Sequence, residues 1–194
     1  MLEYGRIRDR ALLICEPGLE FIRAFMAYLY AGITAIPINL PNPTQKDTVT
    51  RFMAIAGNAR PSLVLTHTAI RERLFADYGK TGPLTDAHWI VTDQCDTVPL
   101  LAIDKLATLR DNELALLQYT SGSTRAPKGV MVLHKNLMHN SRLIRKAFRH
   151  DEISFFGVIW LPHYHDMGLM GGIFYTGAAA VLMSPGAFIH HPLL

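Results

Sequence analysis

The strongest constraint on the fold is a regular alternation of short apolar runs with segments whose apolar residues recur at helical spacing. The apolar runs, each with the length of a buried strand, span residues 11–15, 33–38, 62–66, 88–92 and 114–117. Helical periodicity separates the first four of them, over residues 19–30, 44–58 and 69–78. Because neighbouring parallel strands are usually joined by a helix, this order predicts an α/β fold with a mostly parallel sheet and helices on both faces.

The second half of the chain continues the pattern less regularly. Residues 130–133 are expected to form a strand that turns back as a hairpin. Further elements are predicted as a helix over 135–148, a strand over 155–161, a helix over 167–174 and a strand over 178–183. In the first half, Thr44 is the expected N-cap of the helix over 44–58, with Asp47 in its first turn.

Composition places the chain among globular proteins. It has 194 residues, of which 49% are hydrophobic and 18% charged, and no segment marks a domain boundary. One domain is therefore expected. The two cysteines, Cys15 and Cys95, lack the spacing of a disulfide framework or a thiolate metal site, and no secretory signal is visible at the N-terminus. These features predict a reducing, cytoplasmic location.

Two further features bear on nucleic acids and membranes. A basic cluster at helical spacing comprises Arg142, Arg145, Lys146 and Arg149. It could contact nucleic acid or an acidic partner, but a solvated helix face is favoured because the net charge is only +3. Residues 167–189 carry no formal charge over a length that could span a bilayer. Their several glycines and Pro185 favour a buried helix followed by a strand, so no membrane span is expected.

A cluster of small, hydroxylated and basic residues follows the run at 114–117, with the sequence YTSGSTRAPKGV over residues 119–130. Glycines allow close approach of a backbone to a ligand, and amides, hydroxyls and Lys128 could together bind anionic oxygens. The cluster is not a Walker loop, because Lys128 precedes Gly129 rather than a hydroxyl residue. We interpret it as a polyphosphate cradle, while a plain surface turn stays open as the alternative.

A second polar segment reads WLPHYHDMGL over residues 160–169. In an extended segment His163 and His165 would share one face, a pattern that is compatible with a zinc site. Zinc needs three or four convergent ligands, and no further ligand follows at a recognisable spacing, so no metal site is expected there. Asp166 could instead cap a helix that begins at Met167.

The two segments, in this order and at this spacing, resemble core motifs of the adenylate-forming ligases, the superfamily of acyl-CoA synthetases, luciferases and nonribosomal adenylation domains. The second has the form typical of long-chain fatty acyl-AMP ligases, and residues 17–21, 30–32 and 36–37 are similar to that group too. The resemblance implies that residues 1–194 are part of the large N-terminal, AMP-binding domain. The family's later motifs, including a lysine on a mobile C-terminal lid domain, are not found, so a partial domain without the lid is expected.

The resemblance implies ATP-dependent activation of a long-chain fatty acid to an acyl-adenylate, with loss of pyrophosphate. A carboxylic acid with a pKa of about 4 to 5 is already ionised at neutral pH, so the site must mainly align two anions and stabilise the leaving group. Mg²⁺ is expected to bridge the phosphates. The implied nucleotide-binding residues are Thr120, Ser121, Gly122, Ser123, Thr124, Lys128 and Gly129. Arg125 departs from the commonest form, in which a glycine is frequent.

The implied catalytic residues are Lys128, as a point cation on the phosphates, and His165, near the reacting carboxylate and α-phosphate. The substrate-binding residues implied with them are His165, Asp166, Met167, Gly168 and Gly171. Ordinary core packing is the alternative for the Met and Leu side chains of that segment.

Acceptor and activity are also implied by the resemblance alone. The acyl group would pass to an acyl carrier protein or a polyketide synthase. The close alternative is a long-chain acyl-CoA synthetase, with CoA as acceptor. An alternative without catalysis is a fragment that only binds a nucleotide or an acyl group. The isolated chain is expected to be inactive.

Overall fold

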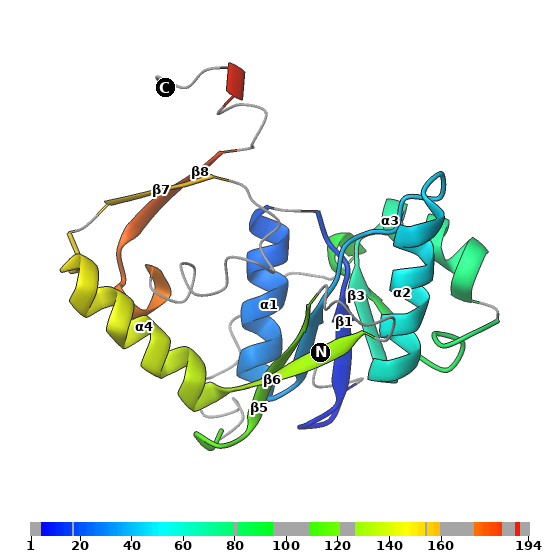
Figure 1. Ribbon diagram of the computed structural model, residues 1–194, viewed down its shortest axis with the longest axis horizontal. Coiled ribbons are helices and arrows are strands. Elements are labelled where there is room, and N and C mark those ends of the chain that lie inside the picture. The colour runs from blue at the N-terminus through cyan, green and yellow to red at the C-terminus, as the bar shows by residue number, and fades with distance from the viewer. Residues whose placement is uncertain are drawn as a thin grey trace. The chain divides into compact units, whose positions relative to one another are not determined.

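The computed structural model describes residues 5–16, 18–79, 81–94, 109–120, 127–153, 155–159, 173–183 and 189–190 (Figure 1). The chain divides into two compact units, Met1–Val132 and Leu133–Leu194. No composition shift in the sequence marks this division. The prediction that residues 1–194 form one partial domain therefore stays a prediction.

A six-stranded sheet is the framework of the first unit. Its strands are β1 (Arg10–Leu13), β2 (Thr34–Pro37), β3 (Leu63–Thr66), β4 (His88–Val91), β5 (Leu114–Thr120) and β6 (Lys128–Leu133). Their order across the sheet is β4-β3-β1-β2-β5-β6. The pairs β1–β2, β1–β3, β3–β4 and β2–β5 are all parallel. The predicted mostly parallel sheet is confirmed.

The helices of this unit cover the two faces of the sheet. They are α1 (Leu19–Ala31), α2 (Lys46–Ala59) and α3 (Thr68–Leu74), the last continued by a π-helical turn over Phe75–Gly79. From β1 the chain crosses to β2 on one side and then returns to β3 on the other. Because such crossovers are right-handed, the reversal places α1 and α2 on opposite faces (Figure 1), as predicted.

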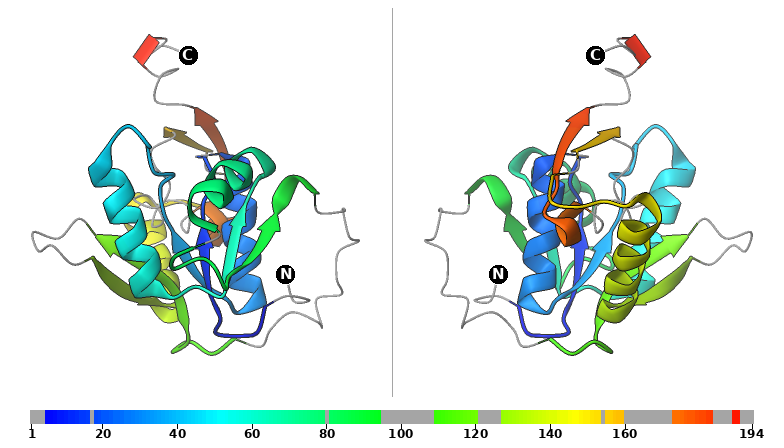
Figure 2. Two further views of the ribbon diagram at one scale, coloured as in Figure 1. Left: turned by 90° about the vertical axis from the view of Figure 1, so that its right-hand side faces the viewer. Right: turned by 90° about the vertical axis from the view of Figure 1, so that its left-hand side faces the viewer.

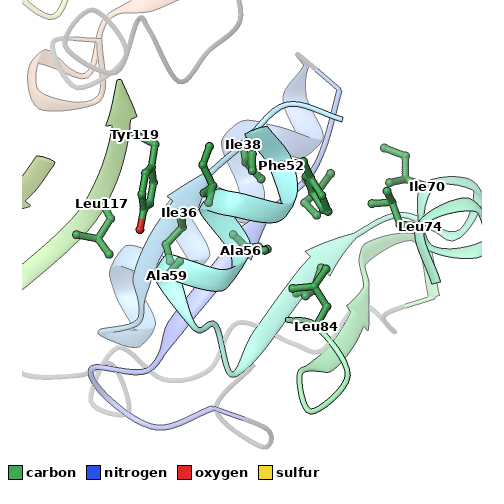
Figure 3. Close-up of a cluster of buried hydrophobic side chains, with 14 residues drawn as sticks. Ile36, Ile38, Phe52, Ala56, Ala59, Ile70, Leu74, Leu84, Leu117 and Tyr119 are labelled. Carbon is green, nitrogen blue, oxygen red and sulfur yellow. The ribbon is translucent and has the colours of Figure 1, made fainter. Parts of the chain in front are cut away.

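Alternate strand residues build a core beneath α2 and α3 (Figure 3). Its buried members are Leu12, Ile14, Ile36, Ile38, Phe52, Ile55, Ala56, Ala59, Val64, Ile70, Leu74, Leu84, Leu117 and Tyr119. On the other face, α1 buries Phe21 and Tyr28, and the Tyr28 hydroxyl donates a hydrogen bond to the Leu12 carbonyl oxygen at 3.3 Å. Both faces of the sheet are therefore buried under helices, which its near-continuous apolar strands require.

The expected capping of the second helix by Thr44 is wrong. Helix α2 begins at Lys46, and its N-cap residue, Gln45, makes no side-chain cap. The Thr44 amide and hydroxyl both donate to Asn42 Oδ1, at 3.1 and 2.9 Å, and Thr48 Oγ1 accepts the Asn42 N–H at 3.0 Å. Thr44 thus belongs to an Asn-centred turn before the helix, because short polar side chains stabilise turns as readily as caps.

The second unit holds α4 (His134–Phe148) and the strands β7 (Phe155–Ile159) and β8 (Ala179–Met183), which pair in parallel (Figure 2). Helix α4 confirms the predicted helix over 135–148, and β7 and β8 confirm the strands predicted over 155–161 and 178–183 within their described residues. The predicted helix over 167–174 lies mostly outside the described residues. The basic cluster lies on the exposed side of α4 and its end. One member, Arg145, stacks over the Tyr175 ring at 6.0 Å. Within the described ranges, no helix is long and apolar enough to span a membrane.

Candidate functional site

The segment predicted as a phosphate cradle begins in one strand of the sheet and ends in the neighbouring one. Thr120 is the last residue of β5 and Lys128 the first of β6, and both are exposed. The sequence placed the end of the first strand at Leu117 and the start of the second at Val130. The structure corrects both, because polar residues at a sheet edge can complete ladder hydrogen bonds as well as apolar ones. Thr120, Lys128 and Gly129 therefore belong to strands.

The other predicted site residues lie outside the described part of the chain. These are Ser121, Gly122, Ser123 and Thr124 of the cradle, and His165, Asp166, Met167, Gly168 and Gly171 of the second motif. His163, the other residue of the zinc alternative, lies outside it as well. Among the described residues, no three His, Cys, Asp or Glu side chains come together as a metal site would require.

The position of the cradle in the sheet suits a binding site. Because β5 runs parallel to β2, its last residue, Thr120, lies at the carboxyl edge of the sheet. Ligands of open α/β sheets bind at that edge. Thr120 offers a hydroxyl and Lys128 an ammonium group at adjacent strand ends, and the segment 121–127 connects them. A hydroxyl and a mobile point cation together suit phosphate oxygens.

Tyr119, the first residue of the cradle segment, is held by three contacts. Its side chain is 6% exposed, and its hydroxyl donates a 2.6 Å hydrogen bond to Asn58 Oδ1 on α2. Arg51 Nη2, also on α2, donates to the Tyr119 carbonyl oxygen at 3.4 Å. The ring lies against Gly129, where a Cβ atom would stand 3.0 Å from Tyr119 Cζ. Burial raises the pKa of the phenol, so it stays neutral and keeps its donor hydrogen.

Sequence reasoning missed Arg51 and Asn58, and assigned Tyr119 no role beyond membership of the motif. Arg51 and Asn58 lie seven positions apart on α2, a spacing that puts two side chains on one helix face. Nothing in the sequence links that face to the cradle. The link appears only once α2 packs beside β5.

Three other polar residues at the carboxyl edge have hydrogen-bond partners within the protein. Thr66 Oγ1 donates to the Ile14 carbonyl oxygen at 2.6 Å, and the Thr68 N–H donates to Asp93 at 2.9 Å. The bonds from Thr68 hold the pKa of the Asp93 carboxyl below its usual value. Cys15 lies at the same edge, and burial raises the pKa of its thiol to about 12, so the thiol is protonated and unreactive at neutral pH. Thr66, Thr68 and Asp93 are thus engaged in hydrogen bonds within the protein.

Comparison with known proteins identifies the family. The model of the family described as AMP-binding enzyme matches residues 6–193. The chain belongs to the AMP-binding enzyme family. The predicted resemblance to adenylate-forming ligases is therefore confirmed, and the cradle lies in a chain of the class that was expected to contain it.

The chain is similar to ligases of fatty acids in particular. It is 39% identical over 190 residues to the medium-chain-fatty-acid acyl-carrier-protein ligase JamA of Moorena producens, covering 95% of this chain and 32% of JamA. It is 35% identical over 201 residues to the long-chain-fatty-acid–AMP ligase FadD23 of Mycobacterium tuberculosis, covering 97% of this chain and 33% of FadD23.

A solved structure supports the fold. The fatty acyl-adenylate ligase of Legionella pneumophila, determined in complex with acyl adenylate and pyrophosphate, matches with a TM-score of 0.77 at 34% identity. The match covers 98% of this chain and 32% of the Legionella chain. The chain thus spans about a third of the length of the relatives that it matches.

Proposed function

We propose that this chain supplies the phosphate-binding part of an enzyme that activates a long-chain fatty acid with ATP, forming an acyl-adenylate. The observation that carries the proposal is the pair Thr120 and Lys128 at adjacent strand ends on the carboxyl edge of the sheet, in a chain of the AMP-binding enzyme family. The placement of Thr120 and Lys128 at the two ends of the segment 121–127 supports a shared role in binding phosphate.

In this proposal the predicted nucleotide-binding residues of the cradle bind the triphosphate. Lys128 neutralises charge on the phosphates, and the amides and hydroxyls of residues 120–124 donate hydrogen bonds to phosphate oxygens. Such donors stabilise the charge that develops on departing pyrophosphate. Mg²⁺ would be held mainly by phosphate oxygens and water, because the described residues of the cradle include no carboxylate, and the Thr120 hydroxyl would be a further oxygen ligand. When bound, Mg²⁺ would offset part of the phosphate charge.

The names of two relatives support the acid and the acceptor that we propose. JamA is named for a fatty acid and an acyl carrier protein, and FadD23 for a long-chain fatty acid and AMP. We propose a fatty acid for this chain, bound near His165, Asp166, Met167, Gly168 and Gly171, and transfer to an acyl carrier protein in the cytoplasm. In the alternative proposal the acceptor is CoA.

Binding of Mg·ATP to the 194-residue chain, measured by titration calorimetry, tests the proposed cradle. A hydrogen bond to a charged group contributes about 1.5 to 3 kcal/mol, so Lys128→Ala should weaken binding about tenfold or more. Lys135→Ala is the matched control, because it removes the same charge from an exposed position on α4. Equal affinities of Lys128→Ala and wild type would remove the proposed role of Lys128.

The same preparation tests whether the chain is complete as an enzyme. Because the chain spans only about a third of its relatives, we expect no exchange of pyrophosphate into ATP in the presence of fatty acids. Exchange by the isolated chain would contradict the proposal that it is one part of the catalytic unit.

A further inference from the structure

We propose that helix α2 positions the phosphate cradle, acting through Tyr119. In this inference Tyr119, Asn58 and Arg51 are positioning residues, which set the places of Thr120 and Lys128 without touching the phosphates themselves. The inference rests on the proposed function only for what the cradle binds, since the contacts are features of the described chain.

The first step is that Tyr119 lies lengthwise along α2. Its carbonyl oxygen accepts a hydrogen bond from Arg51, and its hydroxyl donates one to Asn58. These two helix residues are separated by about 10 Å along the axis, at 1.5 Å per residue. Figure 3 shows the Tyr119 side chain alongside α2, with its hydroxyl at the end of the helix near Ala59. Backbone and ring of Tyr119 are thus fixed by separate turns of one helix.

The second step is that the Tyr119 ring supports the opposite strand. An added Cβ at Gly129 would lie 3.0 Å from Cζ and 3.3 Å from both Cε2 and the hydroxyl oxygen of Tyr119. The Gly129 backbone therefore rests directly on the ring. Since Thr120 follows Tyr119 and Lys128 precedes Gly129, one side chain sets the positions of both ends of the cradle.

The third step concerns what this rigidity does. Donors that stabilise developing charge must be held in place before the reaction, within about 0.5 Å of the productive geometry. Asn58 is exposed, so water can replace the phenol hydroxyl as its partner when that hydroxyl is removed. Loss of the bond should thus loosen the cradle far more than it lowers global stability, which makes the positioning role measurable.

Amide hydrogen exchange of the ligand-free chain, followed by NMR, tests the inference directly. Tyr119→Phe and Asn58→Ala should each speed exchange at Thr120, Gly129 and Val130 about tenfold. Asn58→Asp keeps an acceptor for the hydroxyl and should restore slow exchange. The control Tyr30→Phe removes the same hydroxyl oxygen from an exposed tyrosine of α1 and should leave the exchange rates at these three amides unchanged.

Two results of that experiment would overturn the inference. One is unchanged exchange at Thr120, Gly129 and Val130 in both Tyr119→Phe and Asn58→Ala. The other is an equal rise across β1 and β3, which would assign the effect to global stability. A local rise with β1 and β3 unchanged supports positioning.

Tripolyphosphate binding then separates this inference from the proposed function. If wild type binds tripolyphosphate, Tyr119→Phe should bind it about tenfold more weakly, with Asn58→Asp near wild type. A wild-type chain that binds no tripolyphosphate but shows the local exchange response would refute the proposed function and leave the positioning intact. Unaltered binding together with faster exchange would refute the link between positioning and phosphate affinity.

Discussion

Replacing Gly129 by alanine should destabilise the first unit, although the same replacement usually stabilises a site with room for a methyl group. The new Cβ would stand 3.0 Å from Cζ of Tyr119, where carbon atoms normally approach to about 3.5 to 4.0 Å. The ring cannot easily retreat. It is 6% exposed, and its hydroxyl is bonded to Asn58 at 2.6 Å.

The magnitude follows from two opposing effects. Overpacking a well-filled site costs about 1 to 3 kcal/mol, whereas restricting the unfolded chain by a glycine-to-alanine change contributes about 0.4 to 1 kcal/mol of stability. The difference is about 0 to 2.6 kcal/mol, and because the buried, hydrogen-bonded ring cannot easily retreat, we expect Gly129→Ala to lower the free energy of unfolding by about 1 to 2 kcal/mol. Gly57→Ala is the matched control, because a Cβ there meets no atom within 4 Å. In the interior of α2 that change should stabilise by about 1 kcal/mol.

Urea unfolding followed by far-ultraviolet circular dichroism measures both variants, with shifts in midpoint at constant slope read as changes in stability. A double-mutant cycle identifies the cause. In a Tyr119→Leu background the atoms nearest to the new methyl group are missing, so the added loss from Gly129→Ala should fall below about 0.5 kcal/mol. The claim that the ring supports Gly129 would be refuted if the Gly129→Ala variant were as stable as wild type. It would also be refuted if Gly129→Ala lowered stability as much in the Tyr119→Leu background as in wild type.

Two predictions concern ionisable groups. Because the pKa of the Cys15 thiol is raised to about 12, first by burial and then by Glu20, alkylation of a Cys95→Ser chain by iodoacetamide should accelerate about tenfold per pH unit from pH 8 to 10. A plateau near pH 9 would show an ordinary thiol. Hydrogen bonds from the Arg110 amide and from Arg8 lower the pKa of the Glu113 carboxyl. The ionised carboxylate therefore stabilises the fold at any pH above its unfolded-state pKa of about 4.3. That contribution is lost as the pH falls through the lower pKa of the folded state. Glu113→Gln should therefore be less stable than wild type in urea at pH 7 and equal to it near pH 2, and a difference that persists at pH 2 would indicate packing instead of charge.

Much of the fold could be predicted from local pattern. Apolar runs and helical periodicity located β1 to β4 and α1 to α3 to within a few residues, because burial on both sheet faces imposes those patterns on each element separately. The N-cap of α2 was misplaced because Asn42 and Thr48 hold an alternative turn that short polar residues allow equally well. The strand ends at Thr120 and Lys128 were misplaced because polar strand residues carry no hydrophobic signal.

The sequence predicts which residues form the candidate site, and that prediction stays untested, but it does not predict the contacts around Tyr119. The order of hydroxyl, glycine and lysine residues between 119 and 130 indicated phosphate binding, since that chemistry requires those residue types. The support for the cradle comes from Asn58 and Arg51, which are 61 and 68 residues before Tyr119. No local pattern connects positions that far apart, because only the order of strands in the sheet decides which helix they meet.

That order has a consequence for the evolution of the site. Strand β5 joins the sheet beside β2 rather than beside β4, the strand that precedes it in the chain. This placement brings Tyr119 into the core beneath α2, although α2 lies far upstream of β5 in the sequence. On the proposed positioning, phosphate binding by a cradle whose residues 119–130 are unchanged can be weakened by a substitution on α2. Asn58 is such a position, because it is exposed and lies in no recognisable motif. On this proposal the geometry of the predicted phosphate-binding residues depends on the whole first unit, and the sequence over 119–130 supplies only their chemistry.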